Sequence, residues 1–164
     1  HLRNRRQRQM CIRDSICVAP DVGGTARARA LGKLLNVDLA IVDKRRPAPG
    51  KSEVMNVIGN VKNKTCILVD DIIDSGGTIV NAASELKKRG AKDVHVYVTH
   101  GVLSGNAVEK IKKSSIKNLV VTDTIDNSMK VKKAKNIEVL TISNLVGEAI
   151  KRISNSTSVS DLFK

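Results

Sequence analysis

Short apolar runs rich in β-branched residues alternate with segments patterned like helices from Ile16 to the end of the chain. A strand that is buried on both faces reads as a continuous apolar run, and helices between such strands connect them in parallel. The alternation therefore predicts an α/β fold, in which helices flank a mainly parallel sheet in a Rossmann-like domain. The expected strands are residues 16–19, 39–43, 66–70, 94–100, 118–123 and 137–142, and only the second precedes a Pro- and Gly-rich loop instead of a helix.

One of the expected helices is well defined and begins beside a glycine turn, near Thr78. Basic residues at 87–89 suit the negative end of a helix, and Gly90 can terminate it. Its apolar residues follow the i, i+3, i+4, i+7 spacing of a helix with one buried face: Ile79, Ala82, Ala83 and Leu86.

The chain is strongly basic, with 29 Lys and Arg against 16 Asp and Glu and a formal net charge of +13. Such a charge attracts nucleic acids or phosphorylated small molecules. Aromatic residues make up only 1% of the chain, so the stacking platforms used by single-strand binders are missing. We therefore expect a phosphorylated small molecule and no nucleic acid.

The cysteines and the apolar runs indicate a cytoplasmic protein. Three cysteines are an odd number, and two of them lie in apolar runs, which argues against a disulfide framework. No apolar run approaches the roughly 20 residues of a membrane span. We expect a reducing compartment and no membrane partner.

Residues 1–15 do not share the pattern of the rest. They lack apolar periodicity and hold five of the arginines but one acidic residue. We interpret them as an atypical basic segment, either a disordered extension or a stretch that is not native, and residues 16–164 as one domain.

The stretch LVDDIIDSGGTIV, residues 68–80, crowds three carboxylates beside the glycine turn. Glycines let backbone N–H groups approach a phosphate, and a helix N-terminus adds partial positive charge. Carboxylates repel a phosphate, so they should meet sugar hydroxyls or a divalent cation instead. Ribose 5-phosphate carries a phosphate at one end and a diol at the other, and satisfies both halves. The candidate substrate-binding residues here are Asp70, Asp71, Asp74, Ser75, Gly76, Gly77 and Thr78.

The motif VDDIIDSGGT resembles the phosphoribosyl-binding loop of the type I phosphoribosyltransferase superfamily. In that superfamily two acidic residues hold the ribose hydroxyls, and the following turn holds the 5-phosphate. Two further stretches, residues 19–31 and 42–59, make residues 16–164 similar to ribose-phosphate diphosphokinase, the synthase of phosphoribosyl diphosphate. The resemblance implies a phosphoribosyltransferase-like domain that corresponds to about the C-terminal half of that enzyme.

The family's reaction transfers the diphosphoryl group of ATP to ribose 5-phosphate, giving 5-phosphoribosyl 1-diphosphate and AMP for nucleotide biosynthesis. By resemblance, Lys44 and Arg46 are the catalytic-loop residues, and Arg46 also binds substrate. Cationic side chains suit this reaction, because negative charge must be stabilised on the phosphoryl group during transfer.

The stretch APDVGGTARARAL, residues 19–31, resembles the diphosphate loop of the family. The resemblance implies Asp21, Gly23 and Gly24 as loop residues and Asp21 as a ligand of the cofactor Mg²⁺. Many members have histidine where Val22 stands, so any polar contact of that side chain is lost. The pattern leaves open whether Arg27 and Arg29 face the anion or the solvent.

The resemblance also implies what this chain lacks. The family's N-terminal half supplies most of the ATP pocket and much of the contact surface of a homo-oligomer, so we expect an inactive fragment. Two alternatives are a phosphoribosyltransferase that consumes phosphoribosyl diphosphate and a non-catalytic, associated or regulatory subunit. The basic loop argues against the first, and the intact Lys44, Arg46, Asp70 and Asp74 argue against the second.

Overall fold

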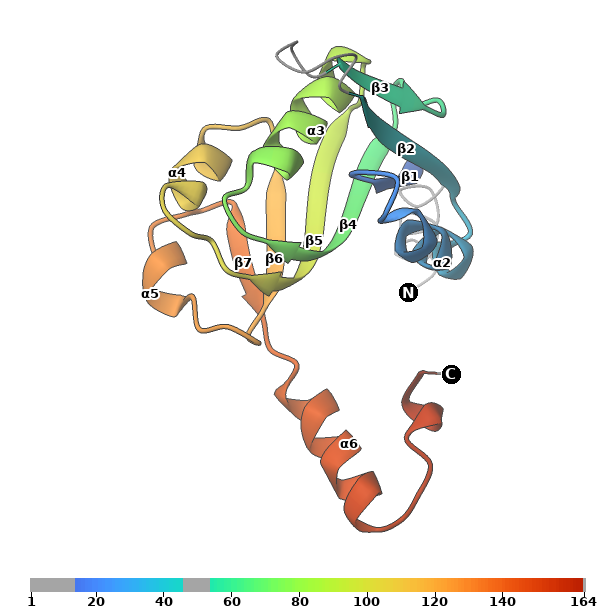
Figure 1. Ribbon diagram of the computed structural model, residues 1–164, viewed down its shortest axis with the longest axis vertical. Helices are drawn as coiled ribbons and strands as arrows, with labels where there is room; N and C mark the ends of the chain where they lie inside the picture. Colours follow the sequence, from blue (N-terminus) through green and yellow to red (C-terminus); the bar gives the residue numbers. More distant parts are fainter. Residues whose placement is uncertain (1–13, 46–53, 164) are drawn as a thin grey trace, which may run out of the picture.

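The computed structural model describes residues 14–45 and 54–163 (Figure 1). The predicted basic segment 1–15 thus lies almost wholly outside the described residues. The elements, in chain order, are β1 (Ser15–Ala19), α2 (Thr25–Leu35), β2 (Asp38–Arg45), β3 (Val54–Ile58), β4 (Thr65–Ile73), α3 (Gly77–Lys88), β5 (Asp93–Gly101), α4 (Ala107–Lys112), β6 (Asn118–Thr122), α5 (Ser128–Val131), β7 (Ile137–Leu140), α6 (Ser143–Ser154) and the 3₁₀-helix η1 (Ser160–Phe163).

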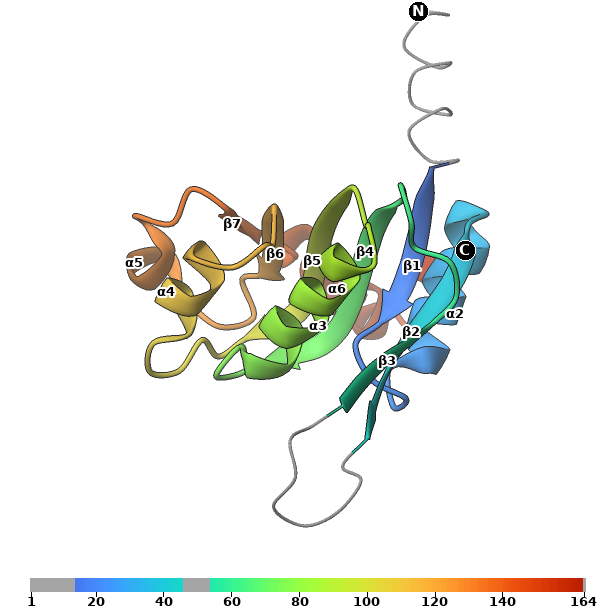
Figure 2. The ribbon, with the colours of Figure 1, turned by 90° about the horizontal axis from the view of Figure 1, so that it is seen from above.

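The strands form one seven-stranded sheet in the order β3-β2-β1-β4-β5-β6-β7. All neighbours pair in parallel except β2 and β3, which are antiparallel. The predicted α/β fold with a mainly parallel sheet and flanking helices is confirmed. Figure 2 shows the twist of the sheet and the helices on its two sides.

The interior strand β1 is buried along its whole length because helices cover both of its faces. Ile16 and Val18 belong to the core cluster that includes the buried residues of α3. Cys17 points to the other face, where a Cβ added to Gly32 of α2 would lie 3.7 Å from the Cys17 Cβ. The apolar run at 16–19 is therefore fully buried, as its sequence predicts.

Helix α3 matches its predicted pattern closely. It begins at Gly77, one residue before the predicted start, and Gly90 follows its end with a φ of 86°. All four predicted apolar residues are buried: Ile79, Ala82, Ala83 and Leu86.

Two strands differ from the expectation. Strand β3 was not predicted; it forms the edge of the sheet next to β2. Strand β4 continues to Ile73 and does not end at Asp70, since Ile72 and Ile73 still pair with β5. The three acidic residues thus lie on and just after the end of a paired strand.

Helix α6 has no buried residue, and Figure 1 shows it extending away from the sheet. Its exposed apolar side chains are Leu145, Val146, Ile150 and Ile153. Within residues 14–45 and 54–163, no helix is long and apolar enough to cross a membrane.

Candidate functional site

The loops that follow β1 and β4 leave the sheet at the same edge. The chain passes from β1 to β2 on one side and later returns to β4 on the other side of β1. In open α/β sheets, ligands bind at such a switch point, outside the carboxyl ends of the strands. The topology therefore brings Asp21 close to the loop after β4, about 50 residues further along the chain.

A pocket of about 210 Å³ lies at this point. It is lined by residues from the loop after β1, the end of β4, the loop that follows it and the start of α3: Asp21, Asp70, Ile72, Ile73, Asp74, Ser75, Gly76, Gly77, Thr78 and Ile79. Most of the predicted site thus lines one pocket, which includes three carboxylates and the start of α3.

The glycine turn has the backbone shape that its sequence predicts. Gly76 has a φ of 76°, a left-handed conformation that favours glycine, and its carbonyl accepts a 3.0 Å hydrogen bond from the Val80 N–H. The first N–H groups of α3 have no partner within the helix, and they point outward at its start. A phosphate in the pocket would meet these N–H groups and the Ser75 and Thr78 hydroxyls.

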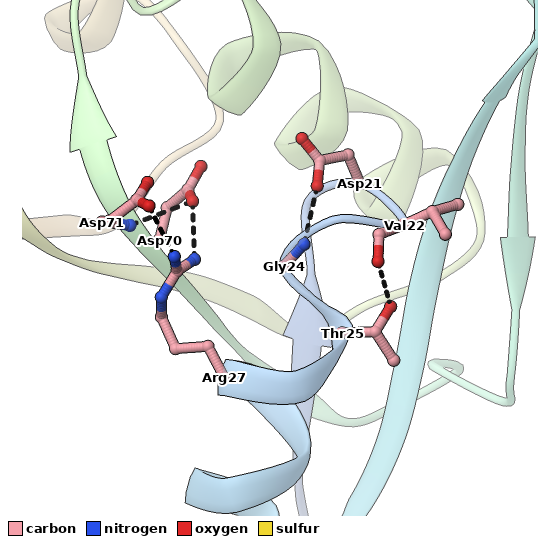
Figure 3. A network of polar contacts seen from close by, with 7 residues as sticks. All are labelled: Asp21, Val22, Gly24, Thr25, Arg27, Asp70 and Asp71. Carbon is pink, nitrogen blue, oxygen red and sulfur yellow. Dashed lines mark hydrogen bonds and ion pairs between the residues drawn. The ribbon is translucent and has the colours of Figure 1, made fainter.

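Asp21 is held by the helix that follows it. Its Oδ1 accepts a 2.8 Å hydrogen bond from the Gly24 N–H, directly before α2 (Figure 3). Gly23 packs closely against the same carboxylate, since an added Cβ would lie 3.3 Å from Asp21 Oδ1. The bond fixes one oxygen of Asp21, while the side chain also lines the pocket.

Arg27 of α2 contacts two of the predicted acidic residues. Its Nη1 lies 2.9 Å from Asp70 Oδ1, and its Nη2 lies 2.6 Å from Asp71 Oδ2. Arg27 is therefore paired with carboxylates and remains 38% exposed. Whether it also faces a bound anion stays a prediction. No local pattern signals this contact, because 43 residues separate Arg27 from Asp70.

The two carboxyls respond differently to this environment. Burial raises the pKa of Asp70, the Asp71 carboxylate adds to the rise, and the Arg27 guanidinium opposes it. Desolvation acts in the same sense on Asp71, but Arg27 and several hydrogen bonds outweigh it and hold the pKa of Asp71 below its ordinary value. Asp71 thus keeps its charge more readily than Asp70.

Some predicted residues lie elsewhere. The Asp71 side chain is 59% exposed and is not part of the pocket wall. Gly23 lines a different pocket, of about 530 Å³, on the outer side of α2, together with Arg29. The backbone of Lys44 is part of β2, its side chain falls outside the described part of the chain, and so does the whole of Arg46.

The described residues contain no cluster of three or more His, Cys, Asp or Glu suited to a metal ion. Mg²⁺ in phosphate-handling sites is usually bound by one or two carboxylates together with substrate phosphates and waters. Asp21 alone in its loop, beside Asp70 and Asp74, fits that kind of donor set.

The sequence model of the family described as phosphoribosyl synthetase-associated domain matches residues 46–164, which include the loop after β4. The chain belongs to this family. Two curated relatives agree with the resemblance noted above. A ribose-phosphate pyrophosphokinase of Hyphomonas neptunium is 62% identical over 90% of this chain, and one of Bradyrhizobium diazoefficiens is 58% identical over 91%. The similarity to the diphosphokinase family is confirmed.

The structure agrees with a solved member of the phosphoribosyl synthetases. The crystal structure of phosphoribosylpyrophosphate synthetase from Mycobacterium smegmatis matches 94% of this chain with a TM-score of 0.81 at 35% identity. The match covers 50% of that protein, and the two curated relatives are covered to 48% and 47%. The chain spans about half the length of these relatives.

Proposed function

We propose that this chain is the part of a ribose-phosphate diphosphokinase that binds ribose 5-phosphate and carries the catalytic loop. The reaction would transfer the diphosphoryl group of ATP to the anomeric hydroxyl of the sugar, giving 5-phosphoribosyl 1-diphosphate and AMP. The observation that carries the proposal is the pocket in which Asp70 and Asp74 lie beside the start of α3.

The two parts of this pocket suit the two ends of the sugar phosphate. The N–H groups and hydroxyls of residues 75–78 would hold the 5-phosphate. Asp70 and Asp74 would accept hydrogen bonds from the ribose hydroxyls, as ionised carboxylates do strongly. We assign Asp71 a supporting role beside Asp70, because its side chain lies outside the pocket wall.

Asp21 is the residue that would hold Mg²⁺, with Gly23 and Gly24 forming the turn for the diphosphate. The ion would supply positive charge to the phosphate oxygens when bound. Asp21 suits this role because the Gly24 N–H occupies only one of its two oxygens.

Lys44 and Arg46 would stabilise the diphosphoryl group during transfer. The backbone geometry supports this role for Lys44: β2 runs parallel to β1, and Ile41 lies beside Ala19, the last residue of β1. Lys44 is three residues further on, beyond the carboxyl end of β1, on the side of the sheet where the strands end and the pocket lies.

We infer that the chain corresponds to the C-terminal half of its relatives, and that the other half supplies most of the ATP pocket and contacts for a homo-oligomer. The half-length matches support only that a second half exists in the relatives, and the exposed apolar face of α6 suits a contact surface. The assignment to the C-terminal half rests on the resemblance. We assign the activity to the cytoplasm, because Cys17 and Cys66 are buried free thiols and a reducing compartment preserves thiols.

The test is to join this chain to the N-terminal half of the Hyphomonas neptunium relative. We expect the fusion to form AMP from ATP and ribose 5-phosphate in the presence of Mg²⁺, and this chain alone to form none. Lys44→Ala in the fusion should lower kcat by about 100-fold with little change in KM, since Lys44 would act on the transition state. An inactive fusion, together with activation of the whole relative by this chain, would favour the non-catalytic subunit instead.

A further inference from the structure

The guanidinium of Arg27 bridges two neighbouring carboxylates, and Figure 3 shows it reaching from the first turn of α2 to the end of β4. The Arg27 side chain is 38% exposed, while that of Asp70 is only 17% exposed. The contact therefore links a helix start to a mostly buried acidic residue of the pocket.

The hydrogen bonds that Asp70 accepts from Arg27 and from the Asp71 N–H both involve the same carboxylate oxygen. Oδ1 accepts a hydrogen bond from Arg27 Nη1 at 2.9 Å and another from the Asp71 N–H at 3.0 Å. Neither bond involves Oδ2, and Figure 3 shows the second oxygen pointing away from Arg27. The two hydrogen bonds to Oδ1 restrict rotation of the carboxylate, so the orientation of Oδ2 is restricted as well.

The same helix start also orients Asp21. The Gly24 N–H holds Asp21 Oδ1 at 2.8 Å, three residues before Arg27. Two carboxylates of the pocket, one after β1 and one on β4, are thus oriented by Gly24, directly before α2, and by Arg27 in its first turn. Helix α2 contributes to the acidic wall of the pocket without lining it.

We propose that Arg27 is a positioning residue, which holds the Asp70 carboxylate so that its second oxygen can accept hydrogen bonds from the ribose hydroxyls. This inference rests on the proposed function, because it assumes a sugar phosphate in the pocket. The forked guanidinium suits the task, since it donates to two carboxylates at once with a fixed geometry. Its positive charge also offsets part of the repulsion among Asp21, Asp70, Asp71 and Asp74.

Arg27 and the sugar could instead compete for the same carboxylates. Arg27 could occupy the acceptors that the sugar needs and leave when the sugar arrives. In that case removing Arg27 would strengthen ribose 5-phosphate binding. A positioning role requires that removing it weakens binding, so the two relationships differ in the sign of one measurement.

The experiment follows the amide signals of Gly76 and Gly77 in the ¹⁵N-labelled 164-residue chain while ribose 5-phosphate or inorganic phosphate is added. We expect Arg27→Ala to weaken ribose 5-phosphate binding by about 10-fold, the scale of losing the support of a charge-assisted hydrogen bond. Phosphate binding should change by less than about 2-fold, because the phosphate loop does not contact Arg27. Arg27→Lys should recover part of the loss, since it retains the charge but not the fork.

Arg29→Ala is the matched control, because Arg29 belongs to the same helix but lines the pocket on its outer side. It should leave both affinities unchanged. Equal or tighter ribose 5-phosphate binding by Arg27→Ala would overturn the positioning role, and so would an equal loss for phosphate, which would indicate general structural support. A wild-type chain that binds ribose 5-phosphate no better than phosphate would instead contradict the proposed function itself.

Discussion

The backbone N–H of Ser104 donates a 3.2 Å hydrogen bond to the backbone carbonyl of Asp74. The N–H groups of Val102 and Leu103 bond in the same way to the carbonyl of Ile73. The segment after β5 thus supports the phosphate loop from behind through the main chain. The shape of the loop should therefore not depend on the Asp74 side chain.

Asp74→Asn should weaken ribose 5-phosphate binding by about 1.5–3 kcal/mol, the value of a hydrogen bond to a charged group. Inorganic phosphate should bind equally or more tightly, because a negative charge beside the anion is removed. Titration calorimetry measures both affinities, and Glu138→Gln, at an exposed position on β7, removes the same charge far from the pocket. A parallel loss of phosphate affinity in Asp74→Asn would show that the side chain shapes the loop after all.

Gly76→Ala should destabilise the chain by about 1–2 kcal/mol, because a Cβ strains a left-handed residue. The space itself is adequate, since the added Cβ would lie 3.6 Å from the nearest atom, Ile111 Cδ1. Gly105→Ala is the matched control, because Gly105 has a φ of 55° and no atom within 4 Å of an added Cβ.

Urea unfolding should show a similar loss of stability for both variants, whereas only Gly76→Ala should lose phosphate affinity. The reason is that relief of strain at Gly76 moves the N–H groups at the start of α3. Unchanged phosphate binding by Gly76→Ala would show that the glycine turn is not part of the phosphate site.

The sequence predicts the site better than it predicts the contacts that support it. The turn at Gly76 and the start of α3 follow from local signals, namely a glycine pair before an amphipathic helix. The extension of β4 beyond Asp70 to Ile73 does not, because aspartate is disfavoured in strands and the pairing of Ile72 and Ile73 with β5 maintains the extension.

The contacts of Arg27 and the existence of β3 depend on distant partners. Arg27 meets Asp70 only because β1 and β4 are neighbours in the sheet, which no spacing of arginines can indicate. Strand β3 has five residues, VMNVI, and gains its order from antiparallel pairing with β2. The assignments of Lys44 and Arg46 stay predictions from the resemblance.

Alkaline pH should destabilise the chain through Cys66. Burial raises the pKa of its thiol to about 12, whereas a thiol in the unfolded chain ionises near pH 8.5. Above that pH the unfolded chain binds fewer protons than the folded chain, so the free energy of unfolding falls as pH rises, by up to about 1.4 kcal/mol per pH unit.

Chemical unfolding between pH 8.5 and 11 measures this slope, and Cys66→Ala should reduce it. Cys17 contributes in the same direction in both proteins, because burial also raises its pKa. Identical slopes for the wild type and Cys66→Ala would show that this thiol is not protected from ionisation in the folded chain.

The exposed apolar face of α6 should make the isolated chain self-associate despite its high charge. Ile150 and Ile153 are 62% and 67% exposed, so changing both to Lys should lower the association state and alter stability by less than about 0.5 kcal/mol. Sedimentation velocity measures the association. The double change Asn144→Lys and Ser154→Lys adds the same charge at exposed polar positions of α6, and an equal effect there would attribute the result to charge alone.

The central claim is that one pocket recognises both ends of a sugar phosphate. Titration calorimetry of the 164-residue chain with ribose 5-phosphate, ribose and inorganic phosphate, under one set of conditions, tests it most directly. The pocket at Asp70, Asp74 and the start of α3 predicts one ribose 5-phosphate per chain, bound more tightly than either of the other two. Ribose 5-phosphate affinity no greater than that of inorganic phosphate would contradict the claim, because the carboxylates would then contribute nothing to recognition of the sugar.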